Sequence, residues 1–573
     1  MAPALRKVTG FAAGGWLRLL PGLTLALFLL PVLAGLAGTL LPAFGILPGS
    51  GATALSLKPW AILLSAPELP GALLASLLSG FLATLLSFTA AVAIAAALHG
   101  TRFHGWLGRL LSPLLALPHA AIAIGFAFLI APSGWLIRAG APLLAPSGQP
   151  PDFSAPGDSL GLALAAGLML KETPFLLLAI LSGLSQFPAD RALLSARMLG
   201  YRPATAWLKV VLPQLYPQLR LPIYAVLAFS LSVVDMGLIL GPSAPPPLAP
   251  LLLVWFNDAS LDSLFPAAAG AVLQAILAGL AILLWRGGEI AFVRLSRSWL
   301  AGGGRGGSGL AARVIGFAAA GGLLLIAVLS IADLALWSFA WRWPFPAALP
   351  VSWTEGNWRA ASPGLGRILG TSLLLGLGAT GVALLLSLGC LENERRHDLH
   401  PTARVLWLIY LPLLVPQISF LFGTAALDAW LGIDATLLAL IWSHLLFVLP
   451  YVFLMLADPY RGLDERYART GLCLGAGRGR VFFGLTLPLL LRPILAAAAV
   501  GFSVSLSLYL PTLFAGAGRF ETLATEAVAL ATGGDRRLAG VYGFLQAALT
   551  LSGFATMRIP RLHAAVSSFA IPE

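Results

Sequence analysis

Long apolar runs alternate with short polar segments along the whole chain, and this pattern predicts its elements. A run of about 20 apolar residues is long enough to cross a bilayer as a helix. Such runs predict twelve membrane-spanning helices, at about residues 19–44, 71–98, 107–131, 159–182, 215–240, 265–285, 314–337, 367–390, 405–425, 437–457, 489–514 and 538–557. The pattern therefore predicts an all-α polytopic membrane protein.

The second half of the chain repeats features of the first half in the same order. The matches are Ser76-Leu77-Leu78 with Ser372-Leu373-Leu374, Pro118 and Gly125 with Pro416 and Gly423, Pro174-Phe175 with Pro450-Tyr451, and Leu273-Gln274-Ala275 with Leu545-Gln546-Ala547. They predict two copies of a six-span module, at residues 1–285 and 314–573. Because each module has an even number of spans, both copies enter the membrane in the same direction, as parallel repeats do.

The predicted junction between the modules is polar and rich in glycine. Residues 286–313 contain the stretch AGGGRGGSG and five arginines. Gly-rich segments of this kind behave as flexible linkers. We therefore expect residues 286–313 to form a linker on the cytoplasmic side.

Composition and charge support the membrane assignment and suggest an orientation. The 573 residues are 58% hydrophobic and only 10% charged, whereas soluble domains carry about 25% charged residues. With a cytoplasmic N-terminus, the segments on the inner side hold 26 of the 35 Lys and Arg residues, which is the positive-inside asymmetry. The net charge of +12 thus indicates orientation, with both termini cytoplasmic, and not a nucleic-acid partner.

Two similar polar stretches lie 275 residues apart, on the predicted cytoplasmic side. Residues 197–213 read RMLGYRPATAWLKVVLP and residues 472–488 read LCLGAGRGRVFFGLTLP; we call them the first and second repeated loops. The glycines of the Leu-Gly pairs permit a tight turn, and the prolines of the Leu-Pro pairs restrain the entry into the next helix. Between them we expect short surface helices in which Trp207 and Phe482 present matched aromatic knobs to a partner.

The loop pattern resembles the second part of the EAA loop found in permease subunits of ABC importers. The matching positions are Gly200, Val210, Leu212 and Pro213, and Gly475, Leu485, Leu487 and Pro488. The first part is degenerate, because Leu194-Ser195-Ala196 and Arg469-Thr470-Gly471 lack the glutamate of the family. Asp190, Asp464 and Glu465 are candidate substitutes. Two modules on one chain are similar to the fused permeases of ferric-iron and thiamine importers.

The resemblance implies a transport subunit that works by alternating access. It implies two copies of a cytoplasmic ATP-binding subunit, a solute-binding protein at the outer face, and contact with membrane lipid. The solute is a small molecule or an ion, and ferric iron, thiamine and others remain open. The implied ATPase-coupling residues are Gly200, Tyr201, Arg202, Pro203, Ala204, Trp207, Leu212, Pro213, Gly475, Arg478, Arg480, Phe482, Phe483, Leu487 and Pro488.

The chain does not contain the sequence signature of a phosphate-binding loop. That signature requires Gly-Lys followed by Ser or Thr, and none of the four lysines follows a glycine. The histidines and cysteines are scattered and form no metal-ligand spacing. We therefore expect no catalytic residue, cofactor or metal in this chain, with ATP and Mg²⁺ held by the partner ATPase.

Ionisable residues inside predicted spans are a second group of candidates. Such residues cost free energy in a membrane and are usually paired or functional. Lys171 and Glu172 lie in the fourth span and Asp235 near the outer end of the fifth; His444 lies in the matching span of the second half. We expect Lys171 to reach Asp235 and Glu172 to face a central pathway, although a purely structural network is the alternative. Asp333 is expected to reach the membrane interface.

Two other classes of protein remain compatible with the sequence. Parallel repeats and intramembrane carboxylates also occur in secondary transporters driven by an ion gradient. A structural membrane protein with no solute is the third possibility. Uptake that depends on ATP and on residues 204–211 would favour the ABC importer.

Overall fold

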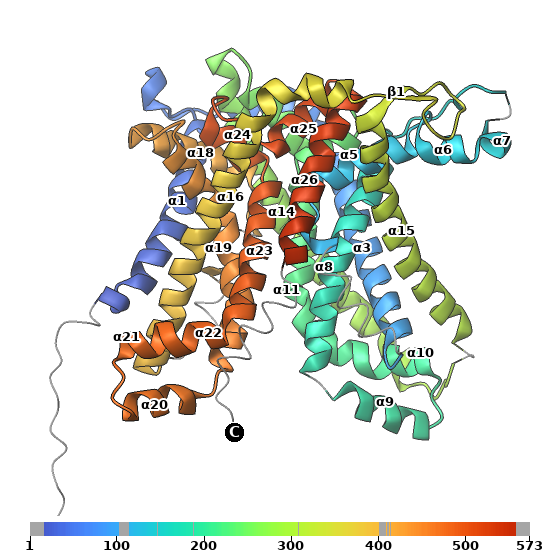
Figure 1. Cartoon of the computed structure of the whole chain (residues 1–573). Coiled ribbons are helices and arrows are strands. Elements are labelled where there is room, and N and C mark those ends of the chain that lie inside the picture. Colours follow the sequence, from blue (N-terminus) through green and yellow to red (C-terminus); the bar gives the residue numbers. More distant parts are fainter. Residues whose placement is uncertain are drawn as a thin grey trace, which may run out of the picture.

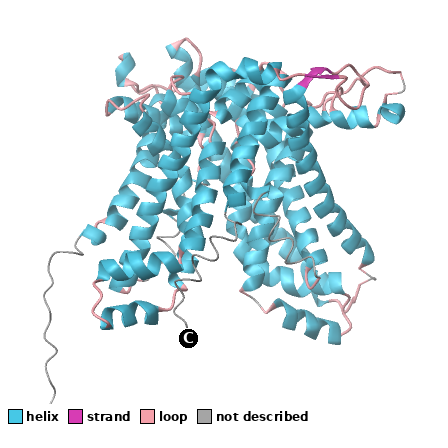
Figure 2. Cartoon of the chain, viewed as in Figure 1, coloured by secondary structure: helices cyan, strands magenta, loops and turns pink. Residues whose placement is uncertain are grey.

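The computed structural model describes residues 16–556, except 102–113, 146, 187, 307–308, 400–407, 410–411 and 413. Helices make up most of this part of the chain, as expected for an all-α protein (Figure 2). The described strands form one short antiparallel pair, β1 (Ala340–Arg342) and β2 (Ser352–Trp353), in which Ala340 lies opposite Trp353. The prediction of an all-α polytopic membrane protein is confirmed.

The helices divide between the two halves of the chain. The first half contains η1 (Trp16–Arg18), α1 (Leu20–Ala43), η2 (Pro48–Ser50), α2 (Lys58–Ser65), α3 (Leu69–Leu98), α5 (His119–Ile130), α6 (Trp135–Ala139), α7 (Ala141–Leu144), α8 (Leu162–Ser185), α9 (Ala189–Met198), α10 (Pro203–Ala206), η3 (Trp207–Val211), α11 (Leu212–Ser232), α12 (Asp235–Leu240), α13 (Leu248–Phe256), η4 (Leu261–Ser263) and α14 (Leu264–Ala301). The second contains α15 (Leu310–Phe339), α16 (Gly356–His397), α18 (Ile418–Trp430), α19 (Leu437–Arg461), α20 (Glu465–Cys473), α21 (Arg478–Val481), η5 (Phe482–Thr486), α22 (Leu487–Leu489), α23 (Leu491–Ser507), α24 (Leu510–Gly516), α25 (Leu523–Thr532) and α26 (Arg536–Thr556).

Within the described residues, eight helices are long and apolar enough to cross a membrane, or nine if the bent segment from α21 to α23 is one span. The predicted fifth and twelfth spans are helical but are not among them, and the described helix of the predicted ninth span, α18 (Ile418–Trp430), is too short to be counted. The fifth, α11, carries three prolines and Arg220, and the twelfth, α26, begins with two arginines. The first parts of the predicted third and ninth spans lie outside the described residues.

The connection between the halves is shorter than the expected linker. Helix α14 continues to Ala301 and α15 begins at Leu310, so residues 286–301 and 310–313 are helical, and the described residues between these helices, 302–306 and 309, are not. Helix α14 ends where the run of glycines begins, at Gly302. The polar residues before Gly302 are compatible with a helix. The division into two modules stays a prediction.

The first helix of each half packs against the other half. Helix α1 lies beside α18, and α15 lies beside α3 and α5 (Figure 1). A Cβ atom added at Gly35 of α1 would lie 2.4 Å from the backbone oxygen of Phe420, and one at Gly125 of α5 would lie 2.3 Å from that of Ser330 on α15. Small residues at such crossings allow helix backbones to approach closely. The two halves are thus interlocked by equivalent crossings.

Equivalent hydrogen bonds recur in the two halves. The pairs are Leu248 N–H to Ser76 Oγ (2.8 Å) and Leu523 N–H to Ser372 Oγ (2.9 Å), then Gln274 Nε2 to Leu231 O (3.1 Å) and Gln546 Nε2 to Leu506 O (2.8 Å). All four side chains belong to the motifs that reveal the repeat in the sequence. They join helices within each half, which explains why the same polar residues occur in both copies.

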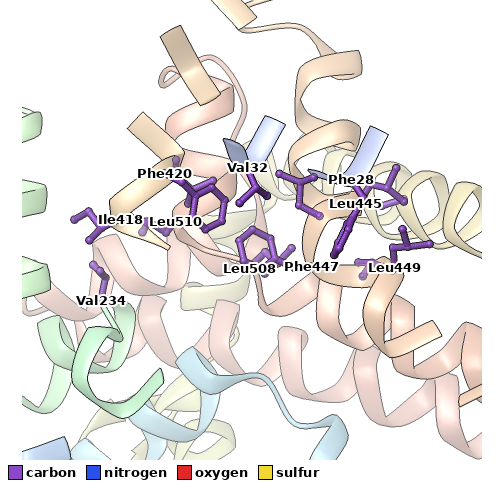
Figure 3. Packing of buried hydrophobic residues seen from close by; sticks show 14 of the residues in the cluster. Phe28, Val32, Val234, Ile418, Phe420, Leu445, Phe447, Leu449, Leu508 and Leu510 are labelled. Atoms are coloured by element: carbon purple, nitrogen blue, oxygen red, sulfur yellow. The ribbon is translucent and has the colours of Figure 1, made fainter. Parts of the chain in front are cut away.

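One helix of each half is interrupted at the same place. The run from α11 to α12 breaks at residues 233–234, and the run from α23 to α24 breaks at residues 508–509. Non-helical backbone at membrane depth is tolerated where protein covers it or where it lines a polar path. Here apolar side chains cover it, and Figure 3 shows part of that cluster, including Val234, Leu508, Leu510, Ile418 and Phe420.

Candidate functional site

The first repeated loop has a helix, a tight turn and a second helix. Helix α9 ends at Met198, and the chain turns at Gly200, whose φ of +85° is readily adopted by glycine. The Gly200 N–H donates to Arg197 O (2.9 Å) and the Tyr201 N–H donates to Ala196 O (3.0 Å), a Schellman-type end that satisfies the last carbonyls of the helix. Pro203 then starts α10, which continues through η3 into α11.

The second repeated loop has the same local structure. Gly475 has a φ of +82° and donates to Leu472 O (3.0 Å), and the Ala476 N–H donates to Gly471 O (3.1 Å). Helices α21, η5 and α22 follow, and the axis bends by 72° before α23. The expected left-handed turns at Gly200 and Gly475 and the short helices after them are therefore present in both copies.

A π-helical turn precedes the Leu-Pro pair in both loops. It spans Trp207–Val211 in the first loop and Phe482–Thr486 in the second. Proline has no N–H to donate to the carbonyl four residues earlier, so an ordinary α-helical turn cannot be closed there. The position of Pro213 and Pro488, one residue after the start of the next helix, accounts for the repeated distortion.

Trp207 is not the exposed knob that the sequence suggests. Its side chain is only 2% exposed and packs in the apolar cluster that contains Leu193, Val211 and Leu215. Phe482 is half-buried. The prediction of a matched pair of aromatic knobs is therefore wrong, because the side chain of Trp207 turns inward and anchors the loop to its own half.

The matched exposed residues are instead aliphatic and aromatic neighbours of these positions. Leu199 and Leu474, which precede the two glycines, are 65% and 82% exposed. Leu208 and Phe483, one residue after the expected knobs, are 42% and 70% exposed. Each loop thus presents two apolar side chains at equivalent positions. The sequence shows that these residues occupy equivalent positions in the two loops, but it does not show which side of each short helix is exposed.

The segment between the halves packs against the first loop. The Arg202 N–H donates to Arg305 O (3.0 Å), and Lys209 Nζ donates to Gly302 O (2.8 Å) while lying 4.8 Å from the ring centroid of Trp299. A Cβ atom added at Gly475, in contrast, would meet no atom within 4 Å. Arg478 and Arg480 of the second loop are exposed. The two loops are therefore alike in backbone and unlike in surroundings.

The acidic residues proposed to replace the missing glutamate all lie on or next to α9 and α20. Asp190 contacts His99 Nε2 at 3.0 Å and its side chain is 91% exposed. Asp464 accepts the Arg466 N–H (2.9 Å) and thereby caps α20, and Glu465 pairs with Arg469 on the same helix. Asp464 and Glu465 thus stabilise the helix before the turn; a role in binding a partner stays a prediction.

Lys171 does not make the expected ion pair with Asp235. Its Nζ donates to the backbone oxygens of Leu115 (2.8 Å) and Leu117 (2.5 Å), just before Pro118. Carbonyls in this segment are free to accept because the helix α5 begins only after Pro118. The lysine therefore joins α8 to the start of α5, although Asp235 remains within electrostatic range of it.

Glu172 and Asp235 lie where the two halves of the chain meet. Glu172 Oε1 is 3.8 Å from His119 Nε2, a neighbour that the sequence pattern does not reveal. Tyr451 of the second half lies within electrostatic range of Glu172, and Tyr509 lies within that of Asp235. We call Lys171, Glu172, Asp235 and His119 the central polar cluster.

His444 is held by two hydroxyl groups inside the second half. Its Nδ1 lies 2.7 Å from Ser505 Oγ, and its Nε2 lies 3.0 Å from Thr512 Oγ1. A neutral imidazole can donate from one nitrogen and accept at the other. His444 thereby ties α19 to both sides of the break between α23 and α24.

Asp333 does not reach the membrane interface. It is completely buried, and neither carboxylate oxygen has a hydrogen-bond partner among the residues described. Arg138 and Arg536 lie within electrostatic range. The expectation of a snorkelling side chain is wrong, because α5 and α26 cover this part of α15.

Comparison with known proteins identifies the family. No protein-family model matches the chain. The chain is 34% identical over 508 residues to the inner membrane ABC transporter permease protein YnjC of Escherichia coli (strain K12), an alignment that covers 88% of this chain and 90% of that protein. The chain belongs to the ABC transporter permeases. In this permease, no three His, Cys, Asp or Glu side chains of the described part are placed to hold a metal ion. As a member of this family the permease is a transport subunit, and the family implies an ATPase partner.

Proposed function

We propose that this permease forms the solute pathway of an ABC importer, with both transmembrane modules on one chain. The two modules are residues 1–285 and 314–573. A pair of ATP-binding subunits docks on the two repeated loops at the cytoplasmic face, and ATP and Mg²⁺ bind to those subunits. A solute-binding protein delivers a small molecule or ion at the outer face of the bacterial inner membrane. Both termini are cytoplasmic in this arrangement.

The observation that carries the proposal is the match between the two loops. Each has a left-handed glycine, a π-helical turn and two exposed apolar side chains at equivalent positions. Both lie at the same end of the molecule (Figure 1). Two equivalent surfaces suit two copies of one partner, and partly exposed apolar side chains are typical anchors of protein interfaces.

The central polar cluster is the proposed lining of the pathway. Its carboxylates lie at the meeting of the halves and next to an interrupted helix, where transporters commonly bind their solutes. In the proposed mechanism, closure of the ATPases moves the repeated loops, and the halves rock about this cluster. The fourth and fifth helices of each half then expose it alternately to the two sides.

The docking proposal is tested with Leu208→Asp and Phe483→Asp, separately and together. Each change puts a charge into the apolar contact and should weaken binding by roughly 2 kcal/mol or more, since hot-spot residues contribute that much. We expect the double variant to insert normally but to lose the ATPase subunit that co-purifies with the wild-type permease.

The matched control is Leu438→Asp on α19, which lies away from the loops and is 61% exposed. It should retain the ATPase. Normal ATPase recovery with the double loop variant would rule out this docking surface. Uptake that persists without any ATPase would instead support an ion-gradient-driven transporter.

A further inference from the structure

A buried charge cluster lies at the loop-proximal end of α16. Glu392 is 3% exposed. Its carboxylate pairs with Arg395 (2.7 Å) and Arg396 (2.6 Å), and it accepts a hydrogen bond from the hydroxyl group of Tyr460 on α19. Buried carboxylates are costly unless they are paired and hydrogen-bonded, and Glu392 has three partners. The cluster therefore joins α16 to the end of α19.

The same cluster reaches the second repeated loop. Arg395 Nη2 donates to Thr486 Oγ1 at 3.2 Å. Thr486 is the last residue of η5, directly before the Leu-Pro pair, and it is 1% exposed. Arg395 also lies 5.5 Å from the ring centroid of Tyr460. Arg395 thus contacts the loop on one side and the Glu392–Tyr460 pair on the other.

Among the described residues, the positions of the first half that correspond to this cluster do not form one. At the repeat offsets, Ala96 corresponds to Glu392, His99 to Arg395 and Val211 to Thr486. Val211 has no side-chain hydroxyl and lies in an apolar cluster, and His99 contacts Asp190 on α9. The first loop is held by apolar packing and by the segment at residues 302–306. The contacts that link a repeated loop to the transmembrane helices therefore differ between the two halves.

We propose that Glu392 is a positioning residue that orients Arg395 to hold Thr486, so that the second repeated loop moves as one body with α16 and α19. At the equivalent position the first loop has Val211, which packs in an apolar cluster, and this loop transmits its motion through α9 and α11. The two ATPase-docking loops of the permease are thus linked to the membrane helices in different ways. The role in transmission rests on the proposed function, whereas the linkage itself does not.

The linkage is tested by hydrogen exchange of the purified permease. Thr486→Val keeps the size of the side chain and removes its hydroxyl, and Thr486→Ser keeps the hydroxyl. Loss of one buried hydrogen bond should speed amide exchange in residues 482–489 about fivefold. We expect this for Thr486→Val and Glu392→Gln, and wild-type exchange for Thr486→Ser.

Glu289→Gln is the matched control. Glu289 is also a buried glutamate, 8% exposed, that pairs with two arginines, Arg220 and Arg286, and accepts hydrogen bonds from Tyr216 and Tyr224. Loss of the Glu289 charge should leave amide hydrogen exchange in residues 482–489 unchanged. Equal exchange in wild type and Thr486→Val, or faster exchange in Glu289→Gln, would overturn the linkage.

The transmission step is tested on the complex with the co-purified ATPase, trapped with ATP, Mg²⁺ and vanadate. In wild type and Thr486→Ser, trapping should alter exchange in both residues 482–489 and residues 384–397. In Thr486→Val and Glu392→Gln, the response of residues 482–489 should persist and that of residues 384–397 should be lost. A retained response of residues 384–397 would overturn the role in transmission. A wild-type permease that retains no ATPase would refute the proposed function, while the exchange data would still decide the linkage.

Discussion

Buried polar side chains in this permease serve two different purposes. His444 uses both ring nitrogens within its own half, so its contacts are complete and account for its burial. Among the residues that the structure describes, Glu172 has a single ion-pair contact, at 3.8 Å to His119, and it lies near the second half. An intramembrane carboxylate with so few partners is a candidate for contact with solute.

Glu172→Gln should lower transport without loss of assembly. The change keeps the shape of the side chain and removes its charge. Transport should fall by about tenfold or more, because a hydrogen bond to a charged group contributes about 1.5–3 kcal/mol. ATP-dependent uptake into membrane vesicles measures this effect, with ATPase co-purification as the test of assembly.

Glu355→Gln serves as the control for this experiment, because it removes a carboxylate that is 75% exposed, lies outside the central polar cluster and pairs with Arg359 nearby in the sequence. It should leave uptake near the wild-type value. Wild-type uptake by Glu172→Gln would exclude the side chain from the pathway.

At the scale of elements, the repeated loops depend on a backbone conformation that only glycine adopts without strain. The positive φ at Gly200 and Gly475 ends α9 and α20 and turns the chain into the next helix. Gly477, two residues later, has a φ of −66° and no atom within 4 Å of an added Cβ. Gly475 and Gly477 therefore differ in φ and not in available space.

Gly475→Ala should destabilise the turn of the second loop by about 1–2 kcal/mol, the cost of a left-handed conformation for a residue with a Cβ. Faster amide exchange in α20 and weaker retention of the ATPase are the expected results. Gly477→Ala should match wild type in both measurements. Equal behaviour of the two variants would show that the left-handed turn does not matter for docking.

At the scale of the whole molecule, the first helix of each half packs against the other half and holds the two halves together. The approach of α1 to α18 is so close that a Cβ at Gly35 would lie 2.4 Å from a backbone oxygen. Backbone atoms cannot rotate away as a side chain can, so the helices would have to separate. The same argument applies to Gly125 against α15.

Gly35→Ala should lower the stability of the whole permease by about 1–3 kcal/mol, the usual cost of overpacking. The melting temperature of the purified protein in detergent reports this change. Gly22→Ala is a matched control on the same helix, because a Cβ there meets no atom within 4 Å. An unchanged melting temperature for Gly35→Ala would contradict the interlocked packing.

Local features of the sequence predicted much of this structure. Long apolar runs identified helices because burial in lipid demands internally hydrogen-bonded apolar segments. Gly200, Gly475, Pro213 and Pro488 marked turns and helix starts because their backbone preferences act locally. The motifs of the repeat, such as Gln274 and Gln546, recurred because each makes an equivalent contact in its half.

The sequence by itself thus determined the class of protein, the repeat and the turns of the two loops. Only the tertiary structure decided which side chains face inward and which partners they find. It buried Trp207 and exposed Leu208, gave Lys171 two carbonyls in place of Asp235, and covered Asp333. The reason is that hydropathy and backbone preference act over a few residues, whereas burial and pairing depend on helices that are hundreds of residues apart in the chain.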